Sequence, residues 1–267
     1  MPPSSARYGW RVLVDVLFDP FAGRWSDARA GAVAAEAAGF DGVWLYDHLA
    51  GSVHGESRVL ECWTTLTAIA ASVPRITIGP LVLNAVNRDP GLLAVMSATL
   101  QEVSGGRLLL GIGAGGGRDT PYAAEQEALG RRVPGAAERR AMVEDVVARL
   151  RTVWSGRVGA VGGFLRPEPA PPVVIGGFGP KMAALAGRVG DGMNVPAGPT
   201  LPDLIRVARE AHEGSGRDPA GFLVTTSCRP SPREHDRLAA LGVGRAIVYV
   251  HAPYTEGVAR AYDALSR

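Results

Sequence analysis

Short apolar runs alternate along the chain with longer amphipathic stretches, and eight of these runs are β-branched, bounded by Gly or Pro, and predict strands. The predicted strands cover residues 12–17, 43–46, 76–83, 108–112, 173–175, 192–195, 222–227 and 246–250. Helical patterns lie at residues 26–38, 60–72, 91–103, 136–154, 181–189, 201–212, 232–241 and 256–265. Ser26 is expected to cap the first helix, and Pro90 and Pro180 suit first-turn positions, where no N–H is needed.

The strict alternation of strand and helix predicts an α/β fold with a parallel sheet covered by helices. Length alone allows one large barrel or two smaller domains. Eight β/α units in about 250 residues are typical of a (β/α)8 TIM barrel, whereas a doubly wound sheet usually stops near six strands. No shift in composition marks a boundary, so residues 1–267 are expected to form a single domain. A barrel of this kind carries its active site where the strands end.

Composition narrows the function classes. With 46% hydrophobic and 20% charged residues the chain is not disordered, and a net charge of +2, spread evenly, does not suggest a nucleic-acid partner. Cys62 and Cys228 have no metal-ligand spacing, so no metal is expected. The first residues lack an apolar signal core and no apolar run could span a membrane, which predicts a cytoplasmic protein acting on a small molecule.

For three side chains outside the predicted strand ends, the sequence predicts whether they are exposed or buried. His212 and His235 lie in polar, Arg- and Glu-rich helical segments and are expected to be solvated. Cys62 lies on the apolar face of a predicted helix and is expected in the core rather than as a nucleophile.

The second predicted strand ends in Asp47 and His48. A carboxylate beside an imidazole can hold a proton and orient a ring or a carbonyl, because histidine titrates near neutral pH. The alternative is structural, with Asp47 capping the loop and His48 covering an edge of the core. Because these residues lie at the carboxyl end of a predicted barrel strand, the catalytic interpretation has about the same weight as the structural one.

The third predicted strand contains Gly79 and Pro80, which should distort a central strand. A bulge is the expected result. It either eases closure of the barrel or presses strained backbone against a bound ring.

The fourth predicted strand runs into residues 111–117, which match the pattern GxGxxG and include Gly113, Ala114 and Gly115. A dinucleotide-binding fold needs the next strand soon afterwards, with an acidic residue at its end, but that strand begins only near residue 172. We therefore reject this reading. The glycines still allow a ligand to approach the main chain closely.

The fifth predicted strand leads into a helix through Gly176, Gly177, Phe178, Gly179, Pro180 and Lys181, the only lysine of the chain. Free main-chain N–H groups between Gly176 and Gly179, the helix dipole and this lysine predict a seat for a phosphate group. A plain left-handed turn is the alternative.

Five segments, in order along the chain, also resemble those of a known family. The first is GFDGVW (39–44) with DHL (47–49), and the second is RITIG (75–79). The third is RDP (88–90) with SGGRL (104–108) and the residues up to Gly115, the fourth is the segment 171–181, and the fifth is GDGMN (190–194). Together they resemble the luciferase-like monooxygenase superfamily of flavin- and deazaflavin-dependent TIM barrels. The resemblance covers residues 39–194.

This resemblance implies a barrel that binds FMN or the deazaflavin coenzyme F420 across its mouth, with the phosphate at Gly176–Gly179. It implies a non-prolyl cis peptide between Leu81 and Val82 that backs the coenzyme ring, with Asn84 at the ring edge. Asp47 and His48 would lie beside the hydride-bearing carbon, with Asp47 positioning His48.

Two departures qualify the resemblance. The sugar-phosphate dehydrogenases of the superfamily carry a catalytic carboxylate at the position of Gly116, so that activity is not expected. The chain is also short between residues 154 and 172, which predicts a more open pocket or one closed by a partner subunit. Relatives commonly form dimers, so a homodimer is expected.

Three functions follow from these observations. The first is a deazaflavin-dependent reductase that transfers hydride from reduced F420 to a C=C or C=N bond of a small metabolite, a choice favoured by the arginine-rich composition through association with organisms that make this coenzyme. The second is an FMN-dependent monooxygenase. The third is a non-catalytic ligand-binding barrel, against which Asp47, His48 and the glycine loops argue.

Overall fold

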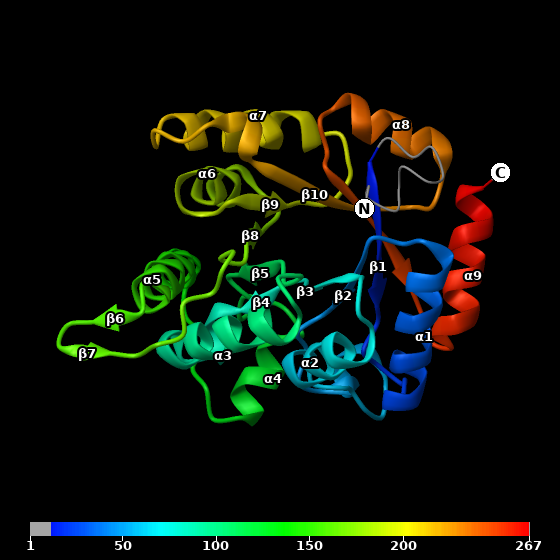
Figure 1. The fold of residues 1–267 in the computed structure, drawn as a ribbon, viewed down its shortest axis with the longest axis horizontal. Coiled ribbons are helices and arrows are strands. Elements are labelled where there is room, and N and C mark those ends of the chain that lie inside the picture. The colour runs from blue at the N-terminus through cyan, green and yellow to red at the C-terminus, as the bar shows by residue number, and fades with distance from the viewer. Residues whose placement is uncertain (1–11, 267) are drawn as a thin grey trace.

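The computed structural model describes residues 12–266, and its central element is one parallel sheet that closes on itself (Figure 1). The order of neighbouring strands is β3-β2-β1-β11-β10-β9-β8-β5-β4. The strands are β1 (Leu13–Phe18), β2 (Gly42–Leu45), β3 (Thr77–Pro80), β4 (Leu83–Asn84), β5 (Leu110–Gly113), β8 (Val173–Gly176), β9 (Gly192–Asn194), β10 (Leu223–Cys228) and β11 (Arg245–Val250).

The two ends of this sheet are halves of one interrupted strand. β3 and β4 are separated only by Leu81 and Val82, which are joined by a cis peptide bond. Ile78 of β3 forms a parallel bridge with Leu108, next to β5, and this bridge closes the barrel. The predicted TIM-barrel fold is therefore confirmed. The third predicted strand is interrupted at Leu81 and Val82, whereas a bulge caused by Gly79 and Pro80 was expected.

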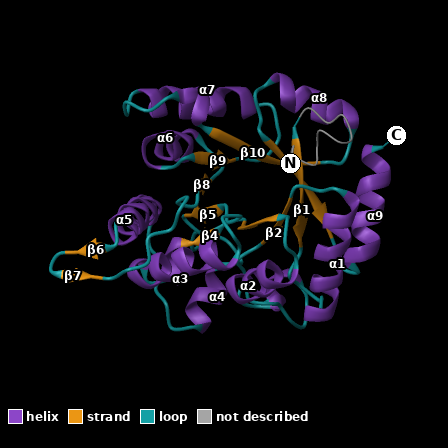
Figure 2. Cartoon of the chain, viewed as in Figure 1, coloured by secondary structure: helices purple, strands orange, loops and turns teal. Residues whose placement is uncertain are grey.

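The helices cover the outside of the barrel (Figure 2). They are α1 (Trp25–Ala38), α2 (Cys62–Ser72), α3 (Pro90–Val103), α4 (Ala123–Ala128), α5 (Ala136–Trp154), α6 (Pro180–Val189), α7 (Leu201–Glu213), α8 (Pro232–Ala240) and α9 (Tyr254–Leu265). The eight predicted helices are all present, and α4 and a small hairpin of β6 (Arg157–Val158) and β7 (Val161–Gly162) are additions. Among the residues that the structure describes, no helix has the length and apolar composition that a membrane crossing requires.

The start of α1 differs from the prediction. Arg24, not Ser26, occupies the N-cap position, and the Asp27 carboxylate accepts a hydrogen bond of 2.9 Å from the Arg24 N–H. Ser26 lies inside the first turn and is exposed. An acidic residue at the third helical position satisfies the cap N–H and favours the positive end of the helix dipole, so the helix begins one residue earlier.

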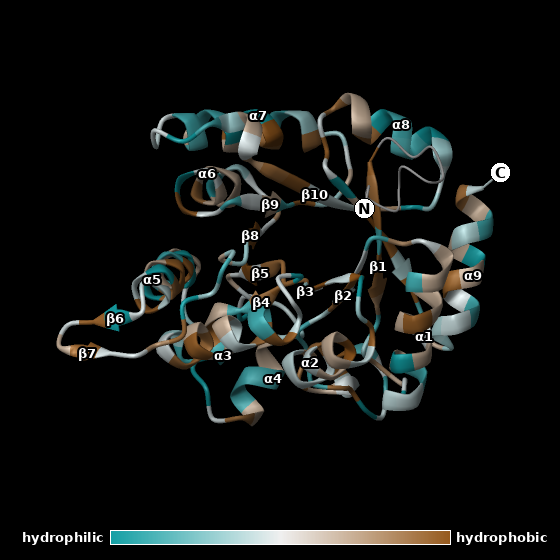
Figure 3. Cartoon of the chain, in the orientation of Figure 1, coloured by the Kyte–Doolittle hydropathy of each residue, from teal (hydrophilic) through white to brown (hydrophobic). Residues whose placement is uncertain are grey.

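The core lies between the strands and the helices, and Figure 3 shows apolar strands at the centre with hydrophilic outer surfaces on helices such as α7. A second apolar cluster of Leu17, Trp44, Leu81 and Ile247 fills the barrel interior. Side chains therefore occupy the inside of the barrel, as in other barrels of this size.

Two of the histidine expectations are wrong. His212 and His235 are both 5% exposed. His212 Nδ1 lies 3.1 Å from the Gly187 carbonyl oxygen, and His235 Nε2 lies 3.7 Å from Cys228 Sγ. Each imidazole lies on the inner side of its helix, where its apolar ring atoms pack and a ring nitrogen finds a partner, although the segments around them are polar. The prediction that Cys62 belongs to the core is confirmed, since its side chain is fully buried.

Candidate active site

A cavity of about 160 Å³ opens at the carboxyl ends of the strands, which we call the mouth of the barrel. It is lined by Tyr46, Asp47, His48, Leu81, Val82, Asn84, Asn87, Gly115, Gly116, Tyr122, Glu125 and Gln126. The ends of β2, β4 and β5 and helix α4 bring these side chains together. Six residues that the sequence predicted for the site lie here together: Asp47, His48, Leu81, Val82, Asn84 and Gly115.

The Asp47 carboxylate hydrogen-bonds to Arg88 and Asn84 and the His48 ring to Glu125, which corrects the predicted role of Asp47 as the residue that positions His48. The buried Asp47 carboxylate accepts hydrogen bonds from both terminal nitrogens of Arg88, one of them at 2.7 Å, and from the Asn84 N–H at 2.8 Å. Adjacent residues of extended chain point to opposite sides, which separates Asp47 from its neighbour. Asp47 instead fixes the segment that follows the cis bond.

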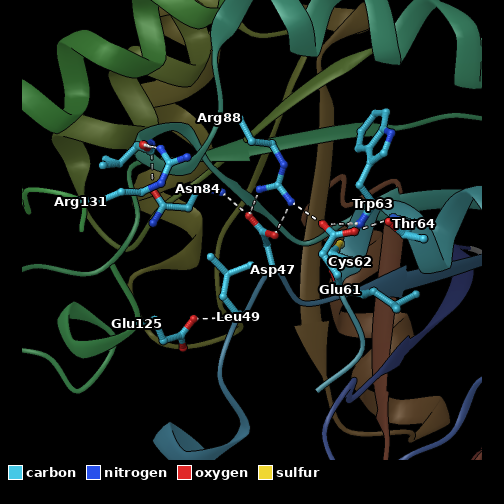
Figure 4. Close-up of polar contacts among 12 residues, drawn as sticks. Asp47, Leu49, Glu61, Cys62, Trp63, Thr64, Asn84, Arg88, Glu125 and Arg131 are labelled. Carbon is cyan, nitrogen blue, oxygen red and sulfur yellow. Dashed lines mark hydrogen bonds and ion pairs between the residues drawn. The ribbon is translucent and has the colours of Figure 1, made fainter. Parts of the chain in front are cut away.

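Arg88 continues this ion-pair network, as Figure 4 shows. It also donates to Glu61 at 2.8 Å, and Glu61 in turn accepts from the N–H groups of Trp63 and Thr64 at the start of α2. Burial would lower the pKa of the Arg88 guanidinium, but the charge and hydrogen bonds of Asp47, with smaller contributions from Cys62 and Glu61, together outweigh burial and raise it. Arg88 therefore stays charged and fully engaged within the protein.

His48 is held by Glu125, a residue that the sequence analysis missed. His48 Nδ1 lies 2.8 Å from Glu125 Oε1, and the other carboxylate oxygen accepts from the Leu49 N–H at 2.6 Å. The Glu125 side chain is only 4% exposed. Because a carboxylate can only accept, Nδ1 carries the hydrogen of this contact, and Nε2 is left to exchange a proton with a bound molecule.

The wall beneath the cavity is built around Val82. The cis peptide bond predicted between Leu81 and Val82 is confirmed. A Cβ atom added at Gly113 would lie 2.5 Å from Val82 Cγ2, and one added at Gly176 would lie 2.9 Å from the same side chain. The space that these two glycines open is therefore taken by Val82, and neither they nor Ala114 line the cavity.

Gly115 leaves space for the side chain of Asn84. Its φ is +67°, and an added Cβ would lie 2.4 Å from Asn84 Oδ1. Glycine at this position therefore permits both the left-handed turn after β5 and the approach of Asn84 to the cavity.

Two buried amide oxygens at the cavity lack partners among the described residues. These atoms are Asn87 Oδ1 and Gln126 Oε1, and both residues line the cavity. A buried acceptor without a donor costs about 1–3 kcal/mol, so such atoms indicate a missing donor.

The predicted phosphate seat lies where β8 leads into α6. Gly177 cannot contribute its N–H, because this group donates to the Asn194 carbonyl at 3.1 Å, a correction to the predicted set of free donors. Gly179 is the N-cap of α6 and has open space on its Cβ side. Phe178 is 87% exposed, and Lys181 is also exposed. The segment 176–181 is separate from the cavity-lining residues.

Comparisons with known proteins agree with this architecture. The family model described as luciferase-like monooxygenase matches residues 8–264. The chain is 32% identical to an F420-dependent glucose-6-phosphate dehydrogenase of Nakamurella multipartita, over 81% of this chain and 65% of the relative. It is 31% identical to an F420-dependent hydroxymycolic acid dehydrogenase of Mycobacterium tuberculosis, over 71% of this chain and 54% of the relative. The chain thus spans between about half and two-thirds of the length of these relatives.

Solved structures resemble the fold along nearly its whole length. An F420-dependent secondary alcohol dehydrogenase in complex with an F420-acetone adduct superposes with a TM-score of 0.79 at 19% identity, covering 96% of this chain and 99% of that one. The coenzyme F420 dependent tetrahydromethanopterin reductase of Methanopyrus kandleri gives a TM-score of 0.70 at 15% identity, covering 95% and 98%.

Proposed function

The chain belongs to the luciferase-like monooxygenase family, and from this premise we propose that it is an oxidoreductase that uses the deazaflavin coenzyme F420 in the cavity at the barrel mouth. The observation that carries the proposal is the His48–Glu125 pair, a proton-transfer group held at the wall of that cavity. The names of the relatives, which are F420-dependent dehydrogenases, support the choice of coenzyme.

The chemistry of the cavity fits a deazaflavin ring. The pyrimidine edge of such a ring presents an N–H between two carbonyl groups. Asn84 lines the cavity, and its side-chain amide can donate to a carbonyl oxygen of this edge. The main chain at Leu81 and Val82 would support the ring, and the start of α6 would hold the phosphate.

The proposed reaction is the reduction of an electron-poor C=C or C=N bond of a small molecule. When bound, the reduced deazaflavin supplies hydride to this bond. His48 would deliver the proton from Nε2 to the atom on which negative charge develops. Glu125 keeps the other ring hydrogen on Nδ1 and fixes the plane of the imidazole.

The coenzyme is tested by titrating the protein with F420 and with FMN separately and following the fluorescence of each. F420 is expected to bind and FMN to bind much more weakly. Binding of FMN alone would contradict the proposal in favour of a flavin monooxygenase. Binding of neither would favour a non-catalytic barrel.

The phosphate seat is tested at Gly179, because a Cβ there meets no protein atom within 4 Å and the backbone is extended, with φ −148°. Gly179→Val should therefore leave folding intact and fill space near the phosphate. We expect the Kd for F420 to rise about 10-fold, which corresponds to about 1.4 kcal/mol. Gly162→Val, in the remote β6–β7 hairpin and equally open, is the matched control. If both variants bind F420 with the same affinity, the phosphate does not bind at this site.

The role of Glu125 is tested by Glu125→Gln, which preserves size and one acceptor for the Leu49 N–H. Turnover should fall about 10- to 100-fold because the imidazole loses its fixed orientation, while affinity for F420 stays within about twofold. The exposed Glu127 lies two residues further along α4, and Glu127→Gln is the control. A changed pH profile of turnover in Glu125→Gln alone would separate positioning of His48 from a purely structural role. Unaltered turnover would contradict the proposal.

A further inference from the structure

Aromatic and imidazole rings line part of the coenzyme cavity and continue past it at the mouth of the barrel. We call this surface the ring wall; it consists of Phe21, Tyr46, His48, His54, Tyr122, Tyr249 and His251. Around His48 the ring centroids lie close together, with His54 at 4.9 Å and Tyr122 at 4.8 Å. Phe21 packs on His54 at 4.1 Å. One half of the ring wall is therefore continuous with the proton-transfer group.

Tyr46 links this half to the end of β11. Its ring centroid lies 6.0 Å from that of His48 and 5.8 Å from that of Tyr249. Tyr249 in turn lies 4.5 Å from His251. Tyr249 is 38% exposed although it belongs to a barrel strand, so part of its ring faces solvent. The ring wall thus offers exposed aromatic surface beside a cavity that Tyr46, His48 and Tyr122 also line.

The charges at this surface disfavour an anionic substrate. None of the described residues that line the cavity is Lys or Arg, and the adjacent Arg88 is engaged by Asp47 and Glu61. Carboxylates lie on both sides instead, with Asp19 Oδ2 3.0 Å from His251 Nδ1 and Glu125 behind His48. Among the described residues that line the cavity, a phosphate group would therefore meet no lysine or arginine.

Both phenols stay neutral at neutral pH, and the Tyr249 O–H donates to the Asp19 carboxylate. Burial, and then the Asp19 charge, raise the pKa of Tyr46 to about 12, and the same two causes raise the pKa of Tyr249. The Tyr46 O–H, beside the aromatic face of Tyr249, suits a ring that carries a carbonyl oxygen.

We infer that the substrate is an uncharged, planar, unsaturated ring compound that lies against the ring wall, and not a phosphorylated sugar. This inference rests on the proposed function, since it names the substrate class of the same site. Planar rings gain from stacked or edge-on contacts with Tyr and His rings, whereas a charged and saturated sugar phosphate gains neither these contacts nor an ion pair.

The test uses the protein saturated with oxidised F420 and two probes, coumarin and glucose 6-phosphate, with binding measured by isothermal titration calorimetry. Coumarin is uncharged and planar and has an electron-poor C=C bond. We expect coumarin to bind at least 10-fold more tightly than glucose 6-phosphate. Tyr249→Leu should weaken coumarin binding about 5- to 10-fold, while Tyr249→Phe, which keeps the ring, stays within about threefold of the unmodified protein.

The outcomes separate the two proposals. Failure of F420 to bind would overturn the proposed function and this inference with it. Binding of F420 together with preferred binding or oxidation of glucose 6-phosphate would overturn the inference alone. Equal coumarin binding by Tyr249→Leu and Tyr249→Phe would show that the ring wall does not contribute to substrate recognition. The comparison of the two probes on the unmodified protein does not depend on how either variant folds.

Discussion

Replacing His48 by alanine is expected to lower turnover by about 10²- to 10⁴-fold, the usual contribution of a placed general acid, with a much smaller change in affinity for F420. The reason is that Glu125 holds Nδ1 and leaves Nε2 for proton exchange at the cavity. The measurement follows oxidation of reduced F420 with coumarin as acceptor, together with a fluorescence titration of F420 binding.

The double variant gives a sharper result than the single one. If Glu125 acts through His48, then Glu125→Gln added to His48→Ala should lower turnover little further, because residues in one network are not additive. Two independent losses that multiply would show that Glu125 acts by another route. Loss of F420 affinity with near-normal turnover at saturating F420 would mean that His48 only supports the ring, and the catalytic role would be withdrawn.

The fold was accessible from the sequence because its strands are short apolar runs bounded by Gly or Pro, and because eight of them alternate with helices. Helix α4 could not be predicted from the sequence. Its six residues are mostly small or polar and show no apolar periodicity, so nothing local marks them as helical. Contacts made elsewhere in the fold fix this helix, above all those of Glu125 with His48 and Leu49.

The candidate site was accessible in part, for a similar reason. The rule that chemistry gathers at strand ends identifies Asp47, His48 and Asn84, and the structure brings them to one cavity. Their partners could not be predicted, because Arg88 is 41 residues from Asp47 in the sequence and Glu125 is 77 residues from His48. Adjacency in sequence suggested the wrong pair, since neighbouring side chains of an extended segment diverge.

A second large effect is expected near the starts of the neighbouring strands β1 and β11, where Arg245 and Asp15 form an ion pair with side chains 7% and 0% exposed. Arg245 Nε and Nη2 donate to the two Asp15 oxygens at 2.7 and 2.6 Å, and Trp44 Nε1 donates to the same carboxylate at 2.7 Å. Arg245→Met would leave the buried carboxylate without its counter-charge. We expect the free energy of unfolding to fall by about 3–5 kcal/mol.

Urea unfolding of Arg245→Met and of a surface control measures this loss. Arg206 pairs with Glu210 on α7, where the side chains are 59% and 61% exposed, so Arg206→Met should change the free energy of unfolding by less than about 1 kcal/mol. The double variant Arg245→Met/Asp15→Leu should recover much of the loss, because removing both charges leaves no isolated ion inside the barrel. A loss below about 1 kcal/mol in Arg245→Met would contradict this account, since water would then have to reach Asp15 in the folded barrel.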